Sequence, residues 1–224
     1  MSLRALIFDV DGTLAETEEA HRAAFNAAFA AAGLNWHWSM ADYGRLLTTT
    51  GGKERMARWR QETGSGPSDA AIAALHRDKT ARYAALWAGG GLQARPGVLA
   101  LAAAARAGGL RLAVATTTSP GNVAALTQAI WGRAAEEVFD VIAAGDEVAA
   151  KKPAPDVYAL ALDRLSLPAG AALAFEDSRN GVLSARAAGL RVVVTPSAYT
   201  AGEDFAGAEV VLADLTGFDL TRWG

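Results

Sequence analysis

The sequence predicts an α/β fold in which a Rossmann-like, doubly wound parallel sheet forms the core and an α-helical cap domain is inserted into it. Short apolar runs alternate with helix-like or loop-like segments along most of the chain, as in parallel sheets covered by helices on both faces. One long stretch near the amino terminus breaks this rhythm with helical patterns only. The 224 residues, 51% of them hydrophobic, suffice for a core and an insert.

Six short apolar runs are expected to form the strands of the sheet. The first, residues 3–10, is partly β-branched and ends in acidic residues and glycine, which is typical of a buried parallel strand. The later runs are residues 111–115, 138–143, 171–175, 191–194 and 210–212. Pro96 and Pro153 indicate helix starts between them, and Gly108 and Gly189 indicate helix ends.

The stretch that interrupts the sheet is expected to be a helical cap over residues 16–88. The remaining residues, 1–15 and 89–224, would form the catalytic core, with hinges near 14–17 and 89–91. The helical segments expected in the cap are residues 21–32, 53–62 and 70–87, with loops at 33–39 and 64–67. Most of the aromatic residues of the insert are expected to serve packing; these residues are Trp36, Trp38, Tyr43, Trp59 and Trp87.

Composition excludes several classes of function. The formal charge of −3 argues against a nucleic-acid partner, because affinity for a phosphate backbone comes from clustered Lys and Arg. The chain has no cysteine, so its chemistry must use oxygen and nitrogen groups. It has no run of about 18 apolar residues and no signal-peptide pattern, so we expect no membrane partner and a cytoplasmic location. We also expect a monomer.

Two carboxylates follow the first strand, in the segment Phe8-Asp9-Val10-Asp11-Gly12-Thr13. Open parallel sheets bind ligands at the edge where their strands end. Alternation directs Asp9 and Asp11 to the same side. Acids this close repel each other, so a raised pKa or a cation is expected, and Mg²⁺ prefers oxygen ligands. Taken alone, the motif fits a metal site and a solvated acidic turn about equally.

Two further segments follow later strands and favour a phosphate site. Thr116 ends an apolar run, and its hydroxyl and the nearby amides suit phosphoryl oxygens, although residues 116–119 also suit a helix-capping loop. Lys152 precedes Pro153 and supplies a point charge for a phosphate or for a nucleophilic carboxylate. An exposed lysine pair is the alternative, but the chain has only four lysines, which makes this pair more suggestive.

A second pair of carboxylates, Glu176 and Asp177, ends another predicted strand. This pair suits metal binding or support of metal ligands. Asp177 or Ser178 also suits the N-cap of a helix, and both interpretations hold together.

The order of these motifs resembles the four signature motifs of the haloacid dehalogenase (HAD) superfamily. DVDGT, Thr after a strand, Lys-Pro and Glu-Asp occur in that order between residues 9 and 177. The helical insert resembles the cap of the subgroup that contains phosphoglycolate phosphatase, β-phosphoglucomutase and the CbbY proteins. Residues 14–19 and 48–55, with His21 and Tyr43, are most similar to the CbbY group.

The resemblance implies a magnesium-dependent phosphatase that acts on a small phosphorylated metabolite, a sugar phosphate. Asp9 would be the nucleophile that forms an aspartyl phosphate. Asp11 would act as general acid and then base, with a pKa close to the working pH. Thr116 and Lys152 would bind the transferring phosphoryl oxygens. The implied magnesium ligands are Asp9, Asp11 through its backbone carbonyl, Asp177, and Glu176 directly or through water.

The cap would set specificity, because a core that handles only a phosphoryl group does not distinguish one sugar from another. The candidate substrate contacts are Glu18, His21, Tyr43, Lys53, Arg55, Thr117 and Ser178. Lys53 or Arg55 would bind a distal phosphate, which fits the CbbY activity on xylulose 1,5-bisphosphate. Glu18 and His21 also suit ordinary helix residues.

Three other functions remain in competition at this level. A phosphoglycolate phosphatase or a β-phosphoglucomutase-like mutase shares the core motifs, although Thr13 follows the DGT pattern common in phosphatases and favours hydrolysis. A receiver-like phospho-switch also combines acids, Thr and Lys on a doubly wound sheet. The helical insert and Asp11 argue against it, because a switch needs neither a cap nor an acid catalyst.

Overall fold

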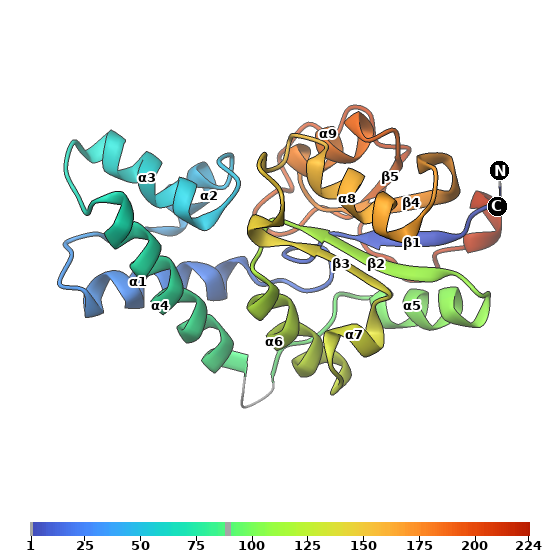
Figure 1. Ribbon diagram of the computed structural model, residues 1–224, viewed down its shortest axis with the longest axis horizontal. Helices are drawn as coiled ribbons and strands as arrows, with labels where there is room; N and C mark the ends of the chain where they lie inside the picture. The colour runs from blue at the N-terminus through green and yellow to red at the C-terminus, as the bar shows by residue number, and fades with distance from the viewer. Residues whose placement is uncertain (1, 88–90) are drawn as a thin grey trace.

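The core is a six-stranded, entirely parallel sheet in the order β3-β2-β1-β4-β5-β6 (Figure 1). The computed structural model describes residues 2–87 and 91–224. The strands are β1 (Ala5–Phe8), β2 (Arg111–Thr116), β3 (Val141–Ala144), β4 (Ala172–Glu176), β5 (Arg191–Val194) and β6 (Val210–Val211). Each predicted strand is present, with ends that differ by at most three residues. The order is that of the doubly wound Rossmann arrangement, whose switch point here lies between β1 and β4.

Helices cover both faces of this sheet. On one face lie α5 (Val98–Ala107), α6 (Pro120–Trp131) and α7 (Ala135–Val138), and on the other lie α8 (Asp156–Leu165) and α9 (Arg179–Ala187) (Figure 1). Short 3-10 helices occupy Gly145–Glu147, Ala169–Ala171 and Leu220–Trp223. Alternation along β1 sends Leu6 and Phe8 into the first hydrophobic cluster and Ile7 into the second.

The predicted helix boundaries differ from the structure at two prolines. The helix expected at Pro96 begins at Val98, and the helix expected at Pro153 begins at Asp156, because a turn precedes each of them. Gly189 does follow a helix end, with a φ of +82° that favours glycine.

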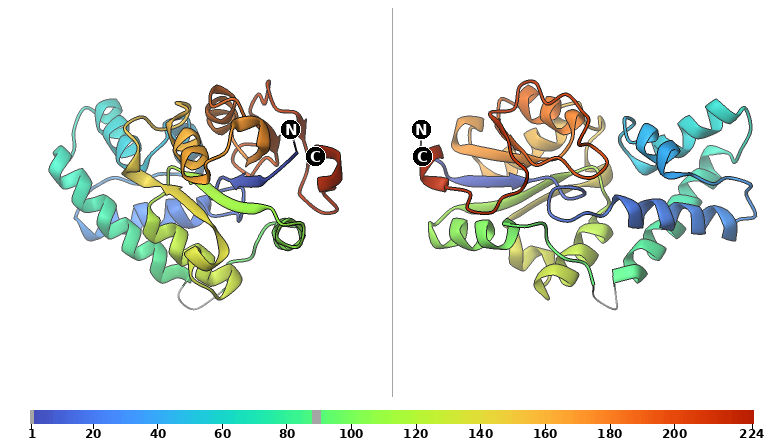
Figure 2. Two further views of the ribbon diagram at one scale, coloured as in Figure 1. Left: turned by 45° about the vertical axis from the view of Figure 1, so that its right-hand side comes forward. Right: turned by 180° about the vertical axis from the view of Figure 1, so that it is seen from behind.

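The insert is a layer of four helices beside the ends of the strands (Figures 1 and 2). They are α1 (Glu18–Ala31), α2 (Met40–Leu46), α3 (Gly52–Thr63) and α4 (Asp69–Trp87). The short helix α2 was not expected; it begins at a capping box between Ser39 and Asp42. Among the described residues, no helix has both the length and the apolar character needed to cross a membrane.

The aromatic side chains of the insert pack, as predicted. Trp38 and Tyr43 are fully buried in the cap cluster, and Trp36 and Trp59 pack against it. Trp87 instead packs against the first hydrophobic cluster, which contains Leu6 and Phe8, and contacts Tyr83. The expected domain boundary at residues 88 and 89, and with it the hinge at residues 89 and 90, lies outside the described residues.

The cap core makes a stability prediction. Phe29 is fully buried and packs edge-on against Trp36 and Trp38. Phe29→Ala should lower the free energy of unfolding by about 3–5 kcal/mol, because it removes apolar contacts and leaves a cavity. The matched control is Met40→Ala, whose side chain is 62% exposed and whose loss should cost roughly 0.5 kcal/mol or less. Urea unfolding measures both, and equal costs would contradict a packed cap core.

Candidate active site

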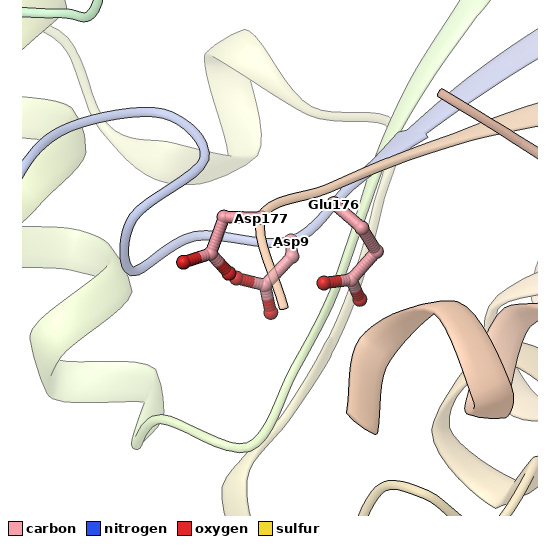
Figure 3. A group of neighbouring side chains, drawn as sticks. All are labelled: Asp9, Glu176 and Asp177. Carbon is pink, nitrogen blue, oxygen red and sulfur yellow. The ribbon is translucent and has the colours of Figure 1, made fainter. Parts of the chain in front are cut away.

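Three carboxylates meet at the switch point of the sheet. β1 and β4 pair in register up to Phe8 and Phe175, so Asp9 and Glu176 occupy successive positions on adjacent strands and Asp177 follows. One carboxylate oxygen from each residue lies within 4.8 Å of the others (Figure 3). All three residues are buried. We call these three residues the acidic edge.

The acidic edge is electrostatically incomplete by itself. Burial and the neighbouring carboxylates raise the pKa of Asp9 to about 8 and raise the pKa of Asp177 well above its usual range. Within the described part of the chain, the buried Oε2 atom of Glu176 has no hydrogen-bond partner. A cluster of hard oxygen atoms with excess negative charge and an unsatisfied acceptor fits a divalent cation such as Mg²⁺. The geometry therefore agrees with a metal site.

Lys152 supplies the positive charge beside this edge. Its Nζ lies 2.6 Å from Oδ1 of Asp9 and 2.6 Å from Oε1 of Glu176, and Tyr158 donates its hydroxyl to the same Glu176 oxygen at 2.6 Å. Burial alone would lower the pKa of Lys152, but the two carboxylates outweigh it and the pKa is raised. Lys152 is therefore charged and placed where it contacts the proposed nucleophile.

Asp11 is held by residues at the start of the cap. Its Oδ1 accepts hydrogen bonds from Thr17 at 2.6 Å and from Nε2 of His21 at 2.8 Å. Nδ1 of His21 lies 2.5 Å from Nζ of Lys79, and Tyr83 stacks on the imidazole. Because an ionised carboxylate only accepts, the Nε2–H of His21 donates to Asp11, which leaves Nδ1 of the neutral ring to accept from Lys79.

In this arrangement the pKa of Asp11 differs from the value near the working pH that the family resemblance implies. Burial raises it, but His21, Thr17 and Lys79 together lower it further, so the net shift is downward from the usual value and away from neutral pH. Burial also lowers the pKa of His21, and it lowers that of Lys79 to about 7. With the cap in this position Asp11 is ionised, which is the charge state of a general base.

A chamber lies between Asp11 and the cap. It is lined by His21, Lys79 and Arg55 from the cap and by Thr117 from the core, among others. An outer cavity of about 310 Å³ shares Thr117 and the cap glycines Gly51 and Gly52 with the chamber, and Lys53 lines it. The Nζ of Lys53 lies 2.5 Å from Asp146 of the core, so this pair spans the two parts of the molecule.

The other predicted site residues lie further from this space. Tyr43 is fully buried; its hydroxyl donates to Glu18 at 2.6 Å and accepts from Arg55 at 2.8 Å, so it orients the two charged groups. Ser178 caps α9 by accepting from the Gly181 amide at 3.2 Å. Thr116 is buried at the end of β2, where its hydroxyl accepts from the Thr118 amide at 3.1 Å.

Several residues of the site were not found from the sequence. Lys79, His76 and Tyr158 were absent from the predicted set, although Lys79 and His76 line the chamber and Tyr158 binds Glu176. Lysine is rare in this chain, and all four lysines lie at the acidic edge, the chamber or the outer cavity. That rarity was the one signal that pointed to Lys79.

The chain belongs to the haloacid dehalogenase-like hydrolase family, whose sequence model matches residues 3–189. It is 62% identical over 216 residues to protein CbbY of Rhodobacter capsulatus, covering 96% of this chain and 95% of that protein.

Two solved structures extend this similarity to the fold. A CbbY aspartate-to-asparagine variant from Rhodobacter sphaeroides, in complex with xylulose-(1,5)bisphosphate, matches with a TM-score of 0.93 and 53% identity over 96% of each chain. A β-phosphoglucomutase candidate from Thermotoga maritima matches with a TM-score of 0.68 and 25% identity over 94% of each chain.

A glycine behind the acidic edge gives a test of the metal site. A Cβ on Gly181 would lie 1.8 Å from Oε2 of Glu176, so Gly181→Ala must displace that carboxylate. We expect roughly 10–100-fold weaker Mg²⁺ affinity, the usual cost of disturbing groups around a metal site. Gly121→Ala is the matched control, because it lies in the first turn of α6 with nothing within 4 Å of the added Cβ. Calorimetric titration with Mg²⁺ compares the two, and equal affinities would contradict the role of Glu176.

Proposed function

We propose that this protein is a magnesium-dependent sugar-bisphosphate phosphatase that removes a phosphoryl group from xylulose 1,5-bisphosphate through an aspartyl phosphate on Asp9. The observation that carries the chemistry is the Lys152 ammonium between Asp9 and Glu176 at the acidic edge. The substrate is supported by the identity to CbbY proteins and by the CbbY structure that holds this bisphosphate.

In the proposed first step, a carboxylate oxygen of Asp9 attacks phosphorus and the bond to the sugar oxygen breaks. Lys152 holds the phosphoryl oxygens because its ammonium lies beside Asp9, and the hydroxyl and amides at residues 116–118 hold them from the end of the adjacent strand β2. Asp11, reprotonated once its cap partners shift, gives its proton to the leaving oxygen. Mg²⁺, held by Asp9, the Asp11 carbonyl, Asp177 and Glu176, supplies charge neutralisation when bound.

In the second step, Asp11 acts as a base on the water that attacks the aspartyl phosphate, and inorganic phosphate leaves. The ionised state of Asp11, held by Thr17 and His21, is the state this step needs. Asp11 must be protonated in the first step and ionised in the second. Because His21 and Lys79 belong to the cap, the position of the cap would determine whether Asp11 carries its proton.

Substrate entry requires the cap to move. The chamber beside Asp11 has a volume of only about 30 Å³, which is room for a water molecule and not for a sugar bisphosphate. The contacts that must open include the Lys53–Asp146 pair and the hydrogen bond from Asn180 to the Thr48 carbonyl. Closure over the substrate then excludes bulk water.

Asp9→Asn should abolish phosphate release, because the amide is not a nucleophile for phosphorus. The measurement is release of inorganic phosphate from a panel of esters that includes xylulose 1,5-bisphosphate and phosphoglycolate, with Mg²⁺ and with chelator. Asp163→Asn, on the exposed side of α8, is the matched control and should keep full activity. Undiminished release by Asp9→Asn would refute the covalent mechanism, and an isomerised monophosphate in place of inorganic phosphate would indicate a mutase.

Lys53 should discriminate between bisphosphates and monophosphates. Lys53→Met removes a positive charge at the outer cavity, so KM for xylulose 1,5-bisphosphate should rise on the order of tenfold while kcat/KM for monophosphates changes little. Lys53→Arg, which keeps the charge, should restore most of the affinity. Steady-state kinetics on both substrate classes test this, and a uniform loss on both would show that Lys53 does not bind the distal phosphate.

A further inference from the structure

The Arg95 side chain binds three backbone carbonyls in the loops that follow β1 and β5. Nη1 donates to the carbonyls of Gly12 and Thr195, the latter at 2.6 Å, and Nη2 donates to the Pro196 carbonyl at 2.7 Å. The side chain is only 10% exposed. None of the mechanistic steps above uses this cation, and among the described residues it makes no hydrogen bond or ion pair with a carboxylate of the acidic edge.

Each of these carbonyls belongs to a loop that shapes the acidic edge. Gly12 directly follows Asp11 and touches Asp177, since a Cβ on Gly12 would lie 2.2 Å from Oδ2 of Asp177. Thr195 and Pro196 precede Ser197, whose hydroxyl lies 2.9 Å from that of Thr200. Thr200 in turn donates to the Asp177 carbonyl at 2.7 Å.

The acidic edge needs contacts that hold its loops in place. Its three carboxylates repel one another, and Asp9 and Asp177 lie just past the last residues of β1 and β4, where the strands give way to loops. A guanidinium presents several donors in a fixed planar arrangement, which suits carbonyls from two separate loops better than the single ammonium of lysine. Arg95 therefore joins the loop after β1 to the loop after β5 through these carbonyls.

The same guanidinium also reaches the hinge between core and cap. Its Nε lies 3.3 Å from Oε1 of Glu16, and the other carboxylate oxygen of Glu16 accepts from the Ala198 amide at 3.4 Å. The Arg95 backbone amide donates to the Leu14 carbonyl at 2.8 Å, so the two chain crossings between core and cap are tied together here.

We propose that Arg95 is a positioning residue for the acidic edge and that its contact with Glu16 couples the position of the cap to the affinity of this edge for Mg²⁺. Glu16 moves with the hinge, whereas Arg95 holds loops of the core. By reciprocity, a bound cation then favours the cap position in which Glu16 and Arg95 are in contact. This inference rests on the metal-dependent function proposed above.

The test is direct calorimetric titration of Mg²⁺ into the full-length protein, without substrate. Arg95→Ala should weaken Mg²⁺ binding roughly 10–100-fold, and Arg95→Lys should lie between that variant and the unchanged protein. Glu16→Gln should weaken it on the order of fivefold without a change in melting temperature, because Glu16 is exposed. Arg106→Ala is the matched control, since Arg106 lies on α5 and binds the Val138 carbonyl and the Asp140 carboxylate.

Each outcome has a distinct meaning. Unchanged Mg²⁺ affinity in folded Arg95→Ala, whatever its melting temperature, overturns the positioning role. If Arg95→Ala does not fold, Arg95→Lys and Glu16→Gln decide, and unchanged affinity in both overturns the inference. If the unsubstituted protein binds no Mg²⁺, the proposed function fails. If it binds Mg²⁺ and none of these variants changes the affinity, only the role of Arg95 is refuted.

Discussion

Mutual repulsion among Asp9, Glu176 and Asp177 is the constraint on which the arrangement of the site depends. Three buried carboxylates at one sheet edge are unfavourable unless cations surround them. Lys152 contacts two of them directly, Tyr158 donates to Glu176, and Arg95 donates to carbonyls of the adjoining loops. The register of β1 with β4 brings the three acids together. The parallel sheet therefore produces the repulsion that these residues offset.

The proposed function assigns phosphoryl chemistry to residues of the core and substrate choice to residues of the cap, with one exception. The acidic edge, Lys152 and Thr116 all come from the core, whereas Arg55 and Lys53 come from the cap. The exception is Asp11, a core residue whose carboxylate partners, Thr17 and His21, lie at the beginning of the insert. The group proposed for proton transfer thus contacts both parts of the molecule.

The sequence predicted what depends on local pattern and missed what depends on tertiary contact. Strands were found because each is a short apolar run separated from the next by helix-like or loop-like sequence. Helix α2 was missed because seven residues held by a capping box have no clear period. Lys79 and Arg95 lie in segments that contain no recognisable motif. Their roles depend on contacts with His21 and with the Gly12 carbonyl, which only the tertiary structure provides. Tyr43 was placed in the cap correctly, but its burial between Glu18 and Arg55 is a property of the fold.

The contact between Asp11 and the cap has a consequence for molecules that are not substrates. An ester too bulky for the cap to close over would keep His21 and Lys79 away from Asp11, so Asp11 would not be held in the ionised state that the proposed hydrolysis of the aspartyl phosphate needs. Such a compound would give up its leaving group and then leave the phosphoryl group on Asp9. Selectivity would then be exercised at the second chemical step as well as at binding.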